Sequence, residues 1–390
     1  MQIRALTGNE AMAEAMRQIN PDVVAAYPIT PATEIVQLFA SFVANGLVDT
    51  EFVATESEHS ALSACVGAAA AGARVMTSTS SQGLSLMYEI LYIAAGLRAP
   101  IVICEVNRSV SAPINIHCDH SDTMGAREAG WIQIYAEDAQ EAYDLTIQAI
   151  KIAEKTFVPI MVSTDGFIIS HCMQRVEMLE DREVQNFIGE HRSPYSLFDK
   201  PITIGPLDLQ DYFFEHKRGQ IEAMNQSLPI IKEVMSEYNS KFSKEYSLIE
   251  PYKTEDANQI LVVSGSTCGT ARMAVDIMRR KGIKAGVLKL HTMRPFPYED
   301  IRTVLNNDSL SLITVLDRSD TMSTMGGPIY VELRSALYES INHPLIANYI
   351  YGLGGRDIEV EQIIDVIQRG EKTITQNKIE KSIDYIGLRE

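Results

Sequence analysis

The sequence predicts an α/β protein built on a doubly wound parallel sheet, followed by a smaller second α/β unit. Short apolar runs alternate with helical patterns up to about residue 165, and the alternation resumes near residue 259. Strands separated by helices pair in parallel, because the chain must cross over the sheet between them. The 390 residues, 46% of them hydrophobic, suffice for the cores of two or three domains.

Five short apolar runs predict the strands of the first unit, at residues 23–27, 52–54, 75–78, 101–106 and 160–163. Helical patterns lie between and around them, at residues 7–19, 33–45, 57–71, 84–96 and 139–155. In the last of these helices we expect Glu141, Asp144 and Lys151 to face water. The run at 101–106 is β-branched and continuous, which is typical of a strand buried on both faces.

The chain changes character between about residues 174 and 254, where prolines, aromatic residues and charge-rich helical patterns predict an extended connector with a helix at 217–242. Strands of the second unit are expected at 260–263, 284–290, 312–316 and 348–351. We therefore expect a first domain with its connector at residues 1–240, a second domain at 255–370 and a peripheral tail at 371–390.

The composition excludes several classes of function. A net charge of −17 disfavours nucleic acid as a partner. Residues 1–9 lack the hydrophobic core of a secretion signal, and the apolar stretch at 65–73 is too short to span a membrane. The five cysteines form no CxxC pair, which disfavours disulfides and favours the cytoplasm. Their wide spacing also disfavours a local iron–sulfur site, so another chain would have to carry any clusters.

Two motifs of the first unit point to a ligand at the ends of its strands. Residues 27–31 (Tyr-Pro-Ile-Thr-Pro) form a rigid loop directly after a strand, where open α/β sheets bind ligands. Glu56 and Glu58 begin the helix at 57–71. Acidic residues in a first turn commonly just complement the helix dipole, but one of these two carboxyls can instead act as an acid or base in a cleft.

Two further motifs lie at strand ends of the same unit. Residues 77–83 are rich in hydroxyls and precede a helix, where backbone N–H groups can hold an anion or a polar ring, or simply cap the helix. The motif lacks the lysine of a P-loop. Arg108 follows the buried strand at 101–106, so its guanidinium is well placed to bind a carboxylate; a surface ion pair is the alternative.

Other polar segments are less informative. His117, Asp119, His120 and Asp122 resemble metal ligands but lack a firm metal spacing, so we expect no metal here. The turn at 264–270 is rich in glycine and serine, yet it does not match the dinucleotide fingerprint.

The combination of these motifs resembles the alpha subunits of the pyruvate:ferredoxin oxidoreductase family, within the 2-oxoacid:ferredoxin oxidoreductases. The matching segments in the first unit are 27–31, 56–61, 80–83, 107–115, 119–124, 130–133 and 165–167, and those in the second are 290–297 and 351–355. The resemblance covers nearly the whole chain and is weakest at 174–254. It implies a thiamine-diphosphate pyrimidine-binding domain followed by a domain like the C-terminal domain of transketolase.

The resemblance also implies roles for individual residues. Glu58, rather than Glu56, matches the carboxyl that hydrogen-bonds the aminopyrimidine ring of the cofactor and so promotes its activation. Thr30 and Arg108 match the residues that hold the substrate carboxylate. The remaining cofactor-contacting positions are Pro28, Ile29, Thr30, Ser81 and Gln82, and the remaining substrate-contacting positions are Ser111 and Asn115.

The resemblance finally implies that this chain works in a complex. Thiamine enzymes hold the diphosphate and Mg²⁺ through a Gly-Asp-Gly motif with an asparagine pair further on, and Thr164-Asp165-Gly166 lacks that continuation. A beta subunit would then supply the diphosphate half of the site. The partners would be beta, gamma and delta type subunits, and Mg²⁺ and the [4Fe-4S] clusters would lie on these partner subunits. The implied reaction converts pyruvate and coenzyme A to acetyl-CoA and CO₂ and passes the electrons to ferredoxin, as in anaerobic metabolism.

Pyruvate is favoured over other 2-oxoacids because Thr30 and Ser111 are small and neutral, and no cations for a second carboxylate are evident in these loops. Branched-chain 2-oxoacids and 2-oxoglutarate stay open as substrates. A thiamine enzyme without redox chemistry and a structural α/β subunit without activity are the remaining alternatives.

Overall fold

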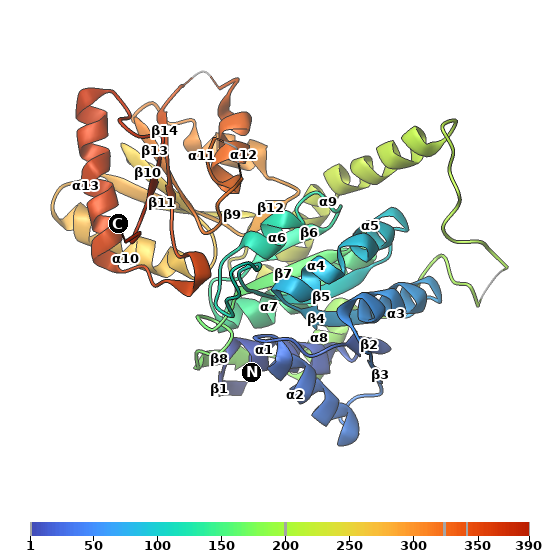
Figure 1. The fold of residues 1–390 in the computed structure, drawn as a ribbon. Coiled ribbons are helices and arrows are strands. Elements are labelled where there is room, and N and C mark those ends of the chain that lie inside the picture. Colours follow the sequence, from blue (N-terminus) through green and yellow to red (C-terminus); the bar gives the residue numbers. More distant parts are fainter. Residues whose placement is uncertain (1, 199–200, 323–324, 341, 390) are drawn as a thin grey trace.

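The computed structural model describes residues 2–198, 201–322, 325–340 and 342–389, which form two α/β units that lie side by side (Figure 1). The N-terminus belongs to the first unit and the C-terminus to the second (Figure 1). Each unit has its own sheet, one of seven strands and one of six, and a two-stranded ribbon accompanies the first. The α/β fold class expected from the alternating pattern is confirmed.

The seven-stranded sheet is parallel except at one edge. Its order is β12 (Thr292–Arg294), β6 (Ile132–Tyr135), β7 (Ile160–Asp165), β5 (Ile101–Asn107), β4 (Val75–Thr79), β2 (Val23–Ala26) and β3 (Glu51–Ala54). Strand β12 comes from the second half of the chain and pairs antiparallel with β6. The edge strand of the first sheet therefore comes from the second unit. This pairing ties the two units together.

Helices cover both faces of this sheet, because the strands are buried on both sides. One face packs against α1 (Gly8–Ile19), α2 (Thr33–Ala44), α7 (Ala139–Thr156) and part of α9 (Phe213–Phe242). The other face packs against α3 (Glu58–Ala70) and α5 (Tyr88–Gly96), with the short helix α4 (Ser81–Leu86) between them in sequence. Val102 and Cys104 of β5 join the first core, and Ile101 and Ile103 join the second. This arrangement is doubly wound.

The second sheet repeats the plan on a smaller scale. Its order is β15 (Ile383–Tyr385), β14 (Leu345–Ile350), β13 (Leu312–Asp317), β10 (Gln259–Val263), β11 (Ala285–Leu290) and β9 (Ile249–Tyr252), with only β9 antiparallel. Helices α10 (Thr267–Arg280) and α13 (Val360–Gln376) cover one face. Helices α11 (Tyr298–Leu305) and α12 (Pro328–Leu337) cover the other. Segment 371–390, expected as a peripheral tail, contains the end of α13 and the edge strand β15.

The segment between the units differs most from the sequence pattern. It contains β8 (Gln174–Met178), which pairs antiparallel with β1 (Gln2–Leu6), and the helix α8 (Asp181–Ile188). Helix α9 packs along α7, so the expectation that Asp144 faces water is wrong. The hydroxyls of Tyr238 and Tyr246 each donate a hydrogen bond of 2.5 Å to the buried Asp144 carboxylate.

Glu141 and Lys151, which were also expected to face water, bind side chains of neighbouring elements. Glu141 accepts a hydrogen bond of 2.5 Å from Lys289 of the second unit. Lys151 lies 2.7 Å from a carboxylate oxygen of Glu237 on α9. Both side chains therefore join α7 to its neighbours, because α9 and the second sheet cover the side of α7 that was expected to face water.

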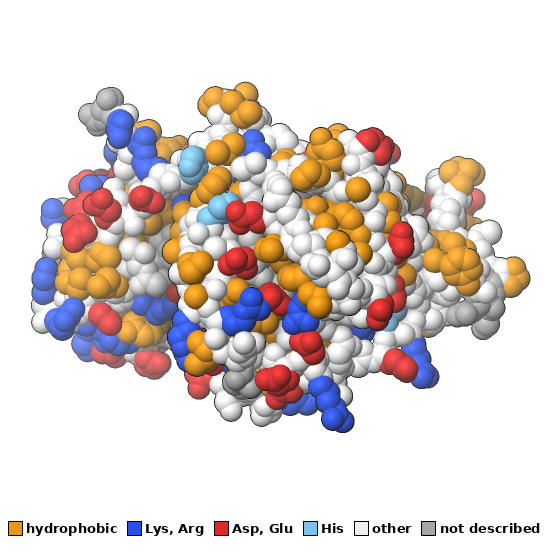
Figure 2. All heavy atoms as spheres, turned by 90° about the horizontal axis from the view of Figure 1, so that it is seen from below, with side chains coloured by type: hydrophobic (Ala, Val, Ile, Leu, Met, Phe, Trp, Pro, Cys, Tyr) orange, Lys and Arg blue, Asp and Glu red, His pale blue; other side chains and the backbone are white. Residues whose placement is uncertain are grey.

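The loop before α9 and the first turns of that helix project away from the body (Figure 1). Figure 2 shows hydrophobic side chains gathered on this projecting segment. Its exposed apolar residues include Tyr195, Leu197, Phe198, Leu207, Leu209, Tyr212, Phe213 and Phe214. Within the described residues, no helix has both the length and the apolar character needed to cross a membrane.

Candidate active site

The polar motifs meet at the carboxyl ends of β2, β4, β5 and β7. These four strands are neighbours in the order β7-β5-β4-β2 and run parallel, so their ends share one edge of the sheet. The loops that leave this edge contain residues 27–31, 80–83 and 108–120, and the segment after Asp165. Ligands of open α/β sheets bind outside such an edge.

Glu58 is the first residue of α3 and lies next to this edge. The Ser57 hydroxyl caps the helix by accepting the Ser60 N–H at 3.2 Å, which fixes the direction of the first turn. The Glu58 side chain is buried at 6% exposure. Its carboxyl makes no hydrogen bond or ion pair with any residue that the structure describes. A buried carboxyl without a partner is costly, so it indicates a place where a ligand completes the contact.

Several polar atoms of the neighbouring segment 79–82 also lack a partner on the described part of the chain. Within the described residues, the hydroxyls of Thr79 and Ser80 and the amide nitrogen of Gln82 are buried and lack a hydrogen-bond partner. Gly83 packs against Glu58 and Thr79: a Cβ added there would lie 2.8 Å from Glu58 Oε1 and would also collide with the Thr79 hydroxyl. The site thus offers hydroxyls, an amide donor and a carboxyl to a polar ring, which fits the donors and acceptors of an aminopyrimidine.

Glu56, the competing carboxyl, is directed elsewhere. It lies before the cap of α3 and accepts a hydrogen bond of 2.5 Å from the Ser60 hydroxyl of that helix. That hydrogen bond lowers the pKa of Glu56. The side chain is satisfied at the surface, so only Glu58 of the two lies in the cluster of unpaired polar groups.

Arg108 is held in place by two backbone carbonyls. Its Nε donates to the carbonyl of Asn115 at 2.7 Å, and its Nη1 donates to the carbonyl of Thr30 at 3.0 Å. The residue is only 7% exposed, and this burial lowers the pKa of Arg108, while the charge of Asp122 opposes the shift. Nη2 makes no hydrogen bond within the described chain. The guanidinium is therefore fixed by the protein on two sides and keeps its Nη2 amino group for an anion.

The remaining sequence candidates lie around Arg108. Pro28 and Thr30 are exposed, and Ile29 packs partly into the first core. Asn115 turns its side-chain amide away from Arg108 and donates to the Gly354 carbonyl at 3.0 Å, so it joins the loop to the second unit. The structure brings Thr30, Asn115 and Arg108 together, whereas exposed Ser111 makes no hydrogen bond with any of them.

Ser81 lies between the two halves of the site. It adopts a left-handed backbone with φ of 46°, which is costly for a serine. Its N–H donates to Asp122 at 3.2 Å, and its hydroxyl donates to the carbonyl of Ser109 at 2.7 Å. Ser81 therefore connects the first turn of α4 to the loop that carries Arg108.

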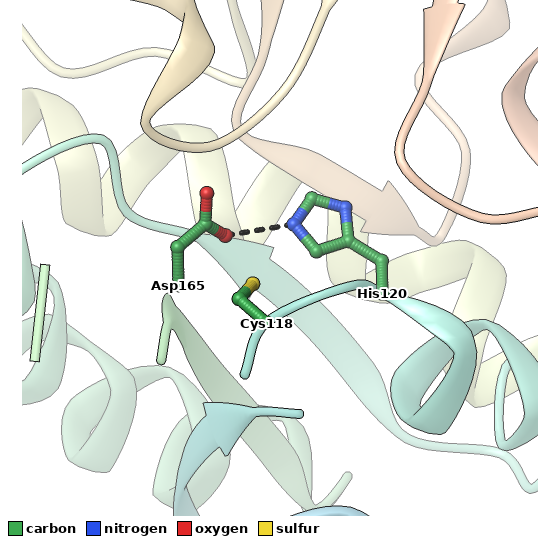
Figure 3. A group of neighbouring side chains, drawn as sticks. All are labelled: Cys118, His120 and Asp165. Atoms are coloured by element: carbon green, nitrogen blue, oxygen red, sulfur yellow. Dashed lines mark hydrogen bonds and ion pairs between the residues drawn. The ribbon is translucent and has the colours of Figure 1, made fainter. Parts of the chain in front are cut away.

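His120, one of the polar residues at 117–122, belongs to an ion network between the two units. His120 Nε2 lies 2.7 Å from Asp165 Oδ1 (Figure 3). Arg318 of the second unit donates to Asp165 Oδ2 at 2.9 Å. Burial raises the pKa of Asp165, but His120 and Arg318 outweigh it and hold that pKa well below its usual range. Cys118 lies beside them, and burial raises the pKa of its thiol well above the usual value.

These contacts assign other roles to the sequence candidates. Asp165 also accepts the Ser266 N–H at 3.1 Å, so the turn at 264–270 is used to seat the second unit on the first. Asp119 accepts from the Ser109 hydroxyl at 2.6 Å and from the Gly354 N–H at 3.1 Å. Both Asp165 oxygens are occupied by protein donors, and a positively charged arginine is one of them, which disfavours a cation at this cluster.

Two buried charged residues near the site, Glu105 and Arg318, were not predicted from the sequence. Glu105 lies in the middle of β5 with no exposed surface, and Arg318 directly follows β13 at 2% exposure. Each is a charged residue inside or beside an apolar strand, which is the signal that could have identified it.

The fold and the site define a class. This is a doubly wound α/β chain that offers an unpaired carboxyl and an oriented guanidinium to a ligand at one sheet edge. The family model described as "Pyruvate flavodoxin/ferredoxin oxidoreductase, thiamine diP-bdg" matches residues 14–236, and "Pyruvate:ferredoxin oxidoreductase core domain II" matches residues 257–363. The chain belongs to the pyruvate flavodoxin/ferredoxin oxidoreductase family.

Curated relatives match over the full length. Pyruvate synthase subunit PorA of Thermotoga maritima is 52% identical over 99% of this chain and 98% of the relative. The protein of the same name in Pyrococcus furiosus is 43% identical over the same shares of the two chains. Ketoisovalerate oxidoreductase subunit VorA of Pyrococcus abyssi is 39% identical, again over 99% and 98%.

Two solved structures share the fold. The 2-oxoglutarate:ferredoxin oxidoreductase of Magnetococcus marinus superposes with a TM-score of 0.71 at 21% identity, covering 95% of this chain and 65% of that one. A split-gene transketolase beta tetramer superposes with a TM-score of 0.56 at 12% identity, covering 96% of this chain and 100% of that one. At these identities the likeness concerns the fold alone.

Proposed function

We propose that this chain is the alpha subunit of a complex that oxidatively decarboxylates pyruvate with coenzyme A, giving acetyl-CoA and CO₂ and reducing ferredoxin. One observation carries the proposal. The Glu58 carboxyl is buried and has no partner on the described chain, in a cluster of unpaired polar groups at the end of a thiamine-diphosphate-binding domain.

The residues of this chain would bind and activate the cofactor ring. Bound thiamine diphosphate supplies a carbon nucleophile and an electron sink for the decarboxylation of a 2-oxoacid. Glu58 would hold a proton at the ring nitrogen of the pyrimidine, where a buried carboxyl interacts strongly because water is excluded. Pro28, Ile29, Thr30, Ser81 and Gln82 would surround the ring.

Arg108 would orient the substrate. Its two hydrogen bonds to backbone carbonyls keep the guanidinium from rotating, so the free Nη2 group can meet a carboxylate in one orientation. The Thr30 hydroxyl would add a contact, and Ser111 and Asn115 would line the same loop. Because Arg108 is largely buried, its charge is screened weakly and its hold on the substrate carboxylate is strong.

Other subunits would complete the site. The relatives are named as subunits, which supports a multi-subunit assembly. We assign the diphosphate half with Mg²⁺ to the beta subunit, and the [4Fe-4S] clusters to the beta, gamma and delta subunits, because this chain lacks the motifs for both. The complex would work in the cytoplasm with ferredoxin as electron acceptor.

The domain boundaries belong to the same proposal. Residues 1–240 would form the pyrimidine-binding domain with its connector, residues 255–370 the transketolase C-terminal-like domain, and residues 371–390 an appendage of the second domain. The matched ranges 14–236 and 257–363 are compatible with these limits.

Pyruvate is preferred to other 2-oxoacids on two grounds. Six full-length relatives that are 41–52% identical are named pyruvate synthase subunits, whereas two ketoisovalerate relatives are 38–39% identical. Thr30 and Ser111 are also neutral, and Arg108 is the cation that the loops 27–31 and 108–120 offer to a substrate carboxylate.

The test is to purify the native complex and to measure coenzyme-A-dependent reduction of a viologen dye with pyruvate, 2-oxoisovalerate and 2-oxoglutarate. The proposal expects the highest kcat/KM for pyruvate and requires coenzyme A for turnover. A higher kcat/KM for either of the other acids would reassign the substrate. Decarboxylation without dye reduction would instead indicate a thiamine enzyme without redox chemistry.

A further inference from the structure

A second carboxyl lies beneath the site and is not used by the chemistry above. Glu105 of β5 has no exposed surface. Neither of its carboxyl oxygens receives a hydrogen bond from a donor in the described part of the chain. The carboxyl of Asp122 lies beside it at the ends of β4 and β5. Asp122 binds Asn107, which is two residues after Glu105 on the same face of β5, and it binds Ser81, which is two residues after the strand partner of Glu105 on β4. Two adjacent buried carboxyls are not both ionised, because their charges repel and water is absent.

Asp122 is the member of this pair that binds other groups. Its Oδ2 accepts the N–H of Arg108 at 2.8 Å and the N–H of Ser81 at 3.2 Å. Its Oδ1 accepts the Asn107 amide at 2.9 Å and the Thr123 N–H at 2.8 Å. These four donors favour the ionised form of Asp122. Its oxygen Oδ2 therefore links the two loops that carry the proposed cofactor-contacting and substrate-contacting residues.

The proton of the pair is best placed on Glu105. Burial raises the pKa of Glu105 well above its usual range, and the neighbouring Asp122 raises it further. Burial also raises the pKa of Asp122, but its hydrogen-bond donors oppose that shift. The other titratable and charged groups around the pair are Cys104 on β5, Arg108, Cys118, Asp119 and Tyr135.

We propose that Glu105 stays protonated and donates its proton to Asp122, and that this carboxyl pair positions Ser81 and Arg108 relative to one another. The proposal deepens the proposed function and rests on it. Glu105 is a positioning residue, since it touches neither substrate nor cofactor. The strained backbone of Ser81, with φ of 46°, supports the role, because strain of this kind persists only where neighbouring contacts hold it.

The experiment uses two variants of the assembled complex. Glu105→Gln keeps an N–H donor for Asp122 at nearly the same volume, whereas Glu105→Met keeps the volume and removes the donor. Thr146→Val serves as the control, because Thr146 is fully buried on α7, and α7 packs in the core that includes Cys104 of β5, away from Asp122. The KM values for pyruvate and coenzyme A, kcat and the melting temperature are measured for each.

We expect Glu105→Gln to match the wild-type KM for pyruvate within about twofold. Glu105→Met should raise the KM for pyruvate about tenfold and leave the KM for coenzyme A unchanged, since one hydrogen bond to a charged group is lost. Thr146→Val should change the melting temperature alone. A folded Glu105→Met complex with an unchanged KM for pyruvate would overturn the positioning role.

An infrared measurement reads the proton without any activity. The difference spectrum between wild type and Glu105→Gln at neutral pH should contain the carbonyl stretch of a protonated carboxyl that shifts in D₂O. If the spectrum shows only the loss of a carboxylate band, Glu105 is ionised and the shared proton is refuted. A wild-type complex that fails to oxidise pyruvate would refute the proposed function, while the infrared band would still report on the pair.

Discussion

Gly83 lies against the Glu58 carboxyl so closely that a Cβ on Gly83 would come within 2.8 Å of Glu58 Oε1. The first turn of α4 therefore has no room for a side chain at the point where it faces Glu58 of α3. The position of Glu58 depends on a residue 25 positions later in the sequence, at the end of a different strand.

Gly83→Ala should displace the Glu58 carboxyl and lower kcat of the assembled complex by about a hundredfold, as expected for misplacing a catalytic group by roughly 1 Å. Gly67→Ala is the matched control, because Gly67 lies on α3 itself and a Cβ there would meet nothing within 4 Å. That control should keep the wild-type rate and raise stability by about 0.5–1 kcal/mol. Equal rates for the two variants would show that the contact is irrelevant.

Arg108→Lys should lower kcat/KM for pyruvate by about a hundredfold, although the charge is kept. A lysine cannot bind the carbonyls of Thr30 and Asn115 and also present a fixed third donor to a carboxylate. Arg192→Lys, at an exposed ion pair with Glu190, should leave kinetics unchanged. Steady-state kinetics with pyruvate as the varied substrate measures both, and full activity of Arg108→Lys would remove Arg108 from the substrate site.

Asp165→Asn should destabilise the chain by about 3 kcal/mol at neutral pH, because it leaves Arg318 buried without its counter-ion. Urea unfolding can be followed through the fluorescence of Trp131, the single tryptophan, which is buried in the first unit. A loss below about 0.5 kcal/mol would mean that the two units do not depend on this ion network.

The pair of Asp165 and Arg318 also makes the free energy of unfolding depend on pH in the acid range. The native pKa of Asp165 lies well below the usual value of 3.8, so its contribution is complete above that value and is lost as the pH falls through the native pKa. Between about pH 5 and pH 3, the unfolding free energy of the wild type should therefore fall more steeply than that of Asp165→Asn. Parallel pH profiles for the two proteins would contradict the lowered pKa.

The sequence patterns located most of the sheet strands because apolar, β-branched runs are local signals. The run expected at 101–106 is β5, Ile101–Asn107, and the helix expected at 139–155 is α7, Ala139–Thr156. Strands without that signal were missed: β12 is three residues long, and β1 pairs with β8 across more than 160 positions of sequence. Pairing at such a distance depends on tertiary contacts that a local pattern does not contain.

The same distinction applies to the site. Arg108 was found because it follows a buried strand, and Glu58 because its motif resembles a family. The fixation of Arg108 by the carbonyls of Thr30 and Asn115 could not be read from the sequence, since the donors and acceptors come from loops brought together only in the folded chain. For Asp144 the local pattern gave the wrong result. Its position on the helix predicted exposure to water, but α9 covers the side chain.

The proposed chemistry depends most directly on the carboxyl of Glu58, and one measurement tests the role of that carboxyl. The rate of pyruvate- and coenzyme-A-dependent dye reduction should be compared for complexes that carry Glu58→Gln and Glu56→Gln, each loaded with thiamine diphosphate. We expect Glu58→Gln to lose at least about a thousandfold in kcat, the loss that removal of a general acid or base produces. Glu56→Gln, whose carboxyl is bound to Ser60 at the surface, should stay within about twofold of wild type. A Glu58→Gln complex that turns over pyruvate at the wild-type rate would contradict the assignment of this site.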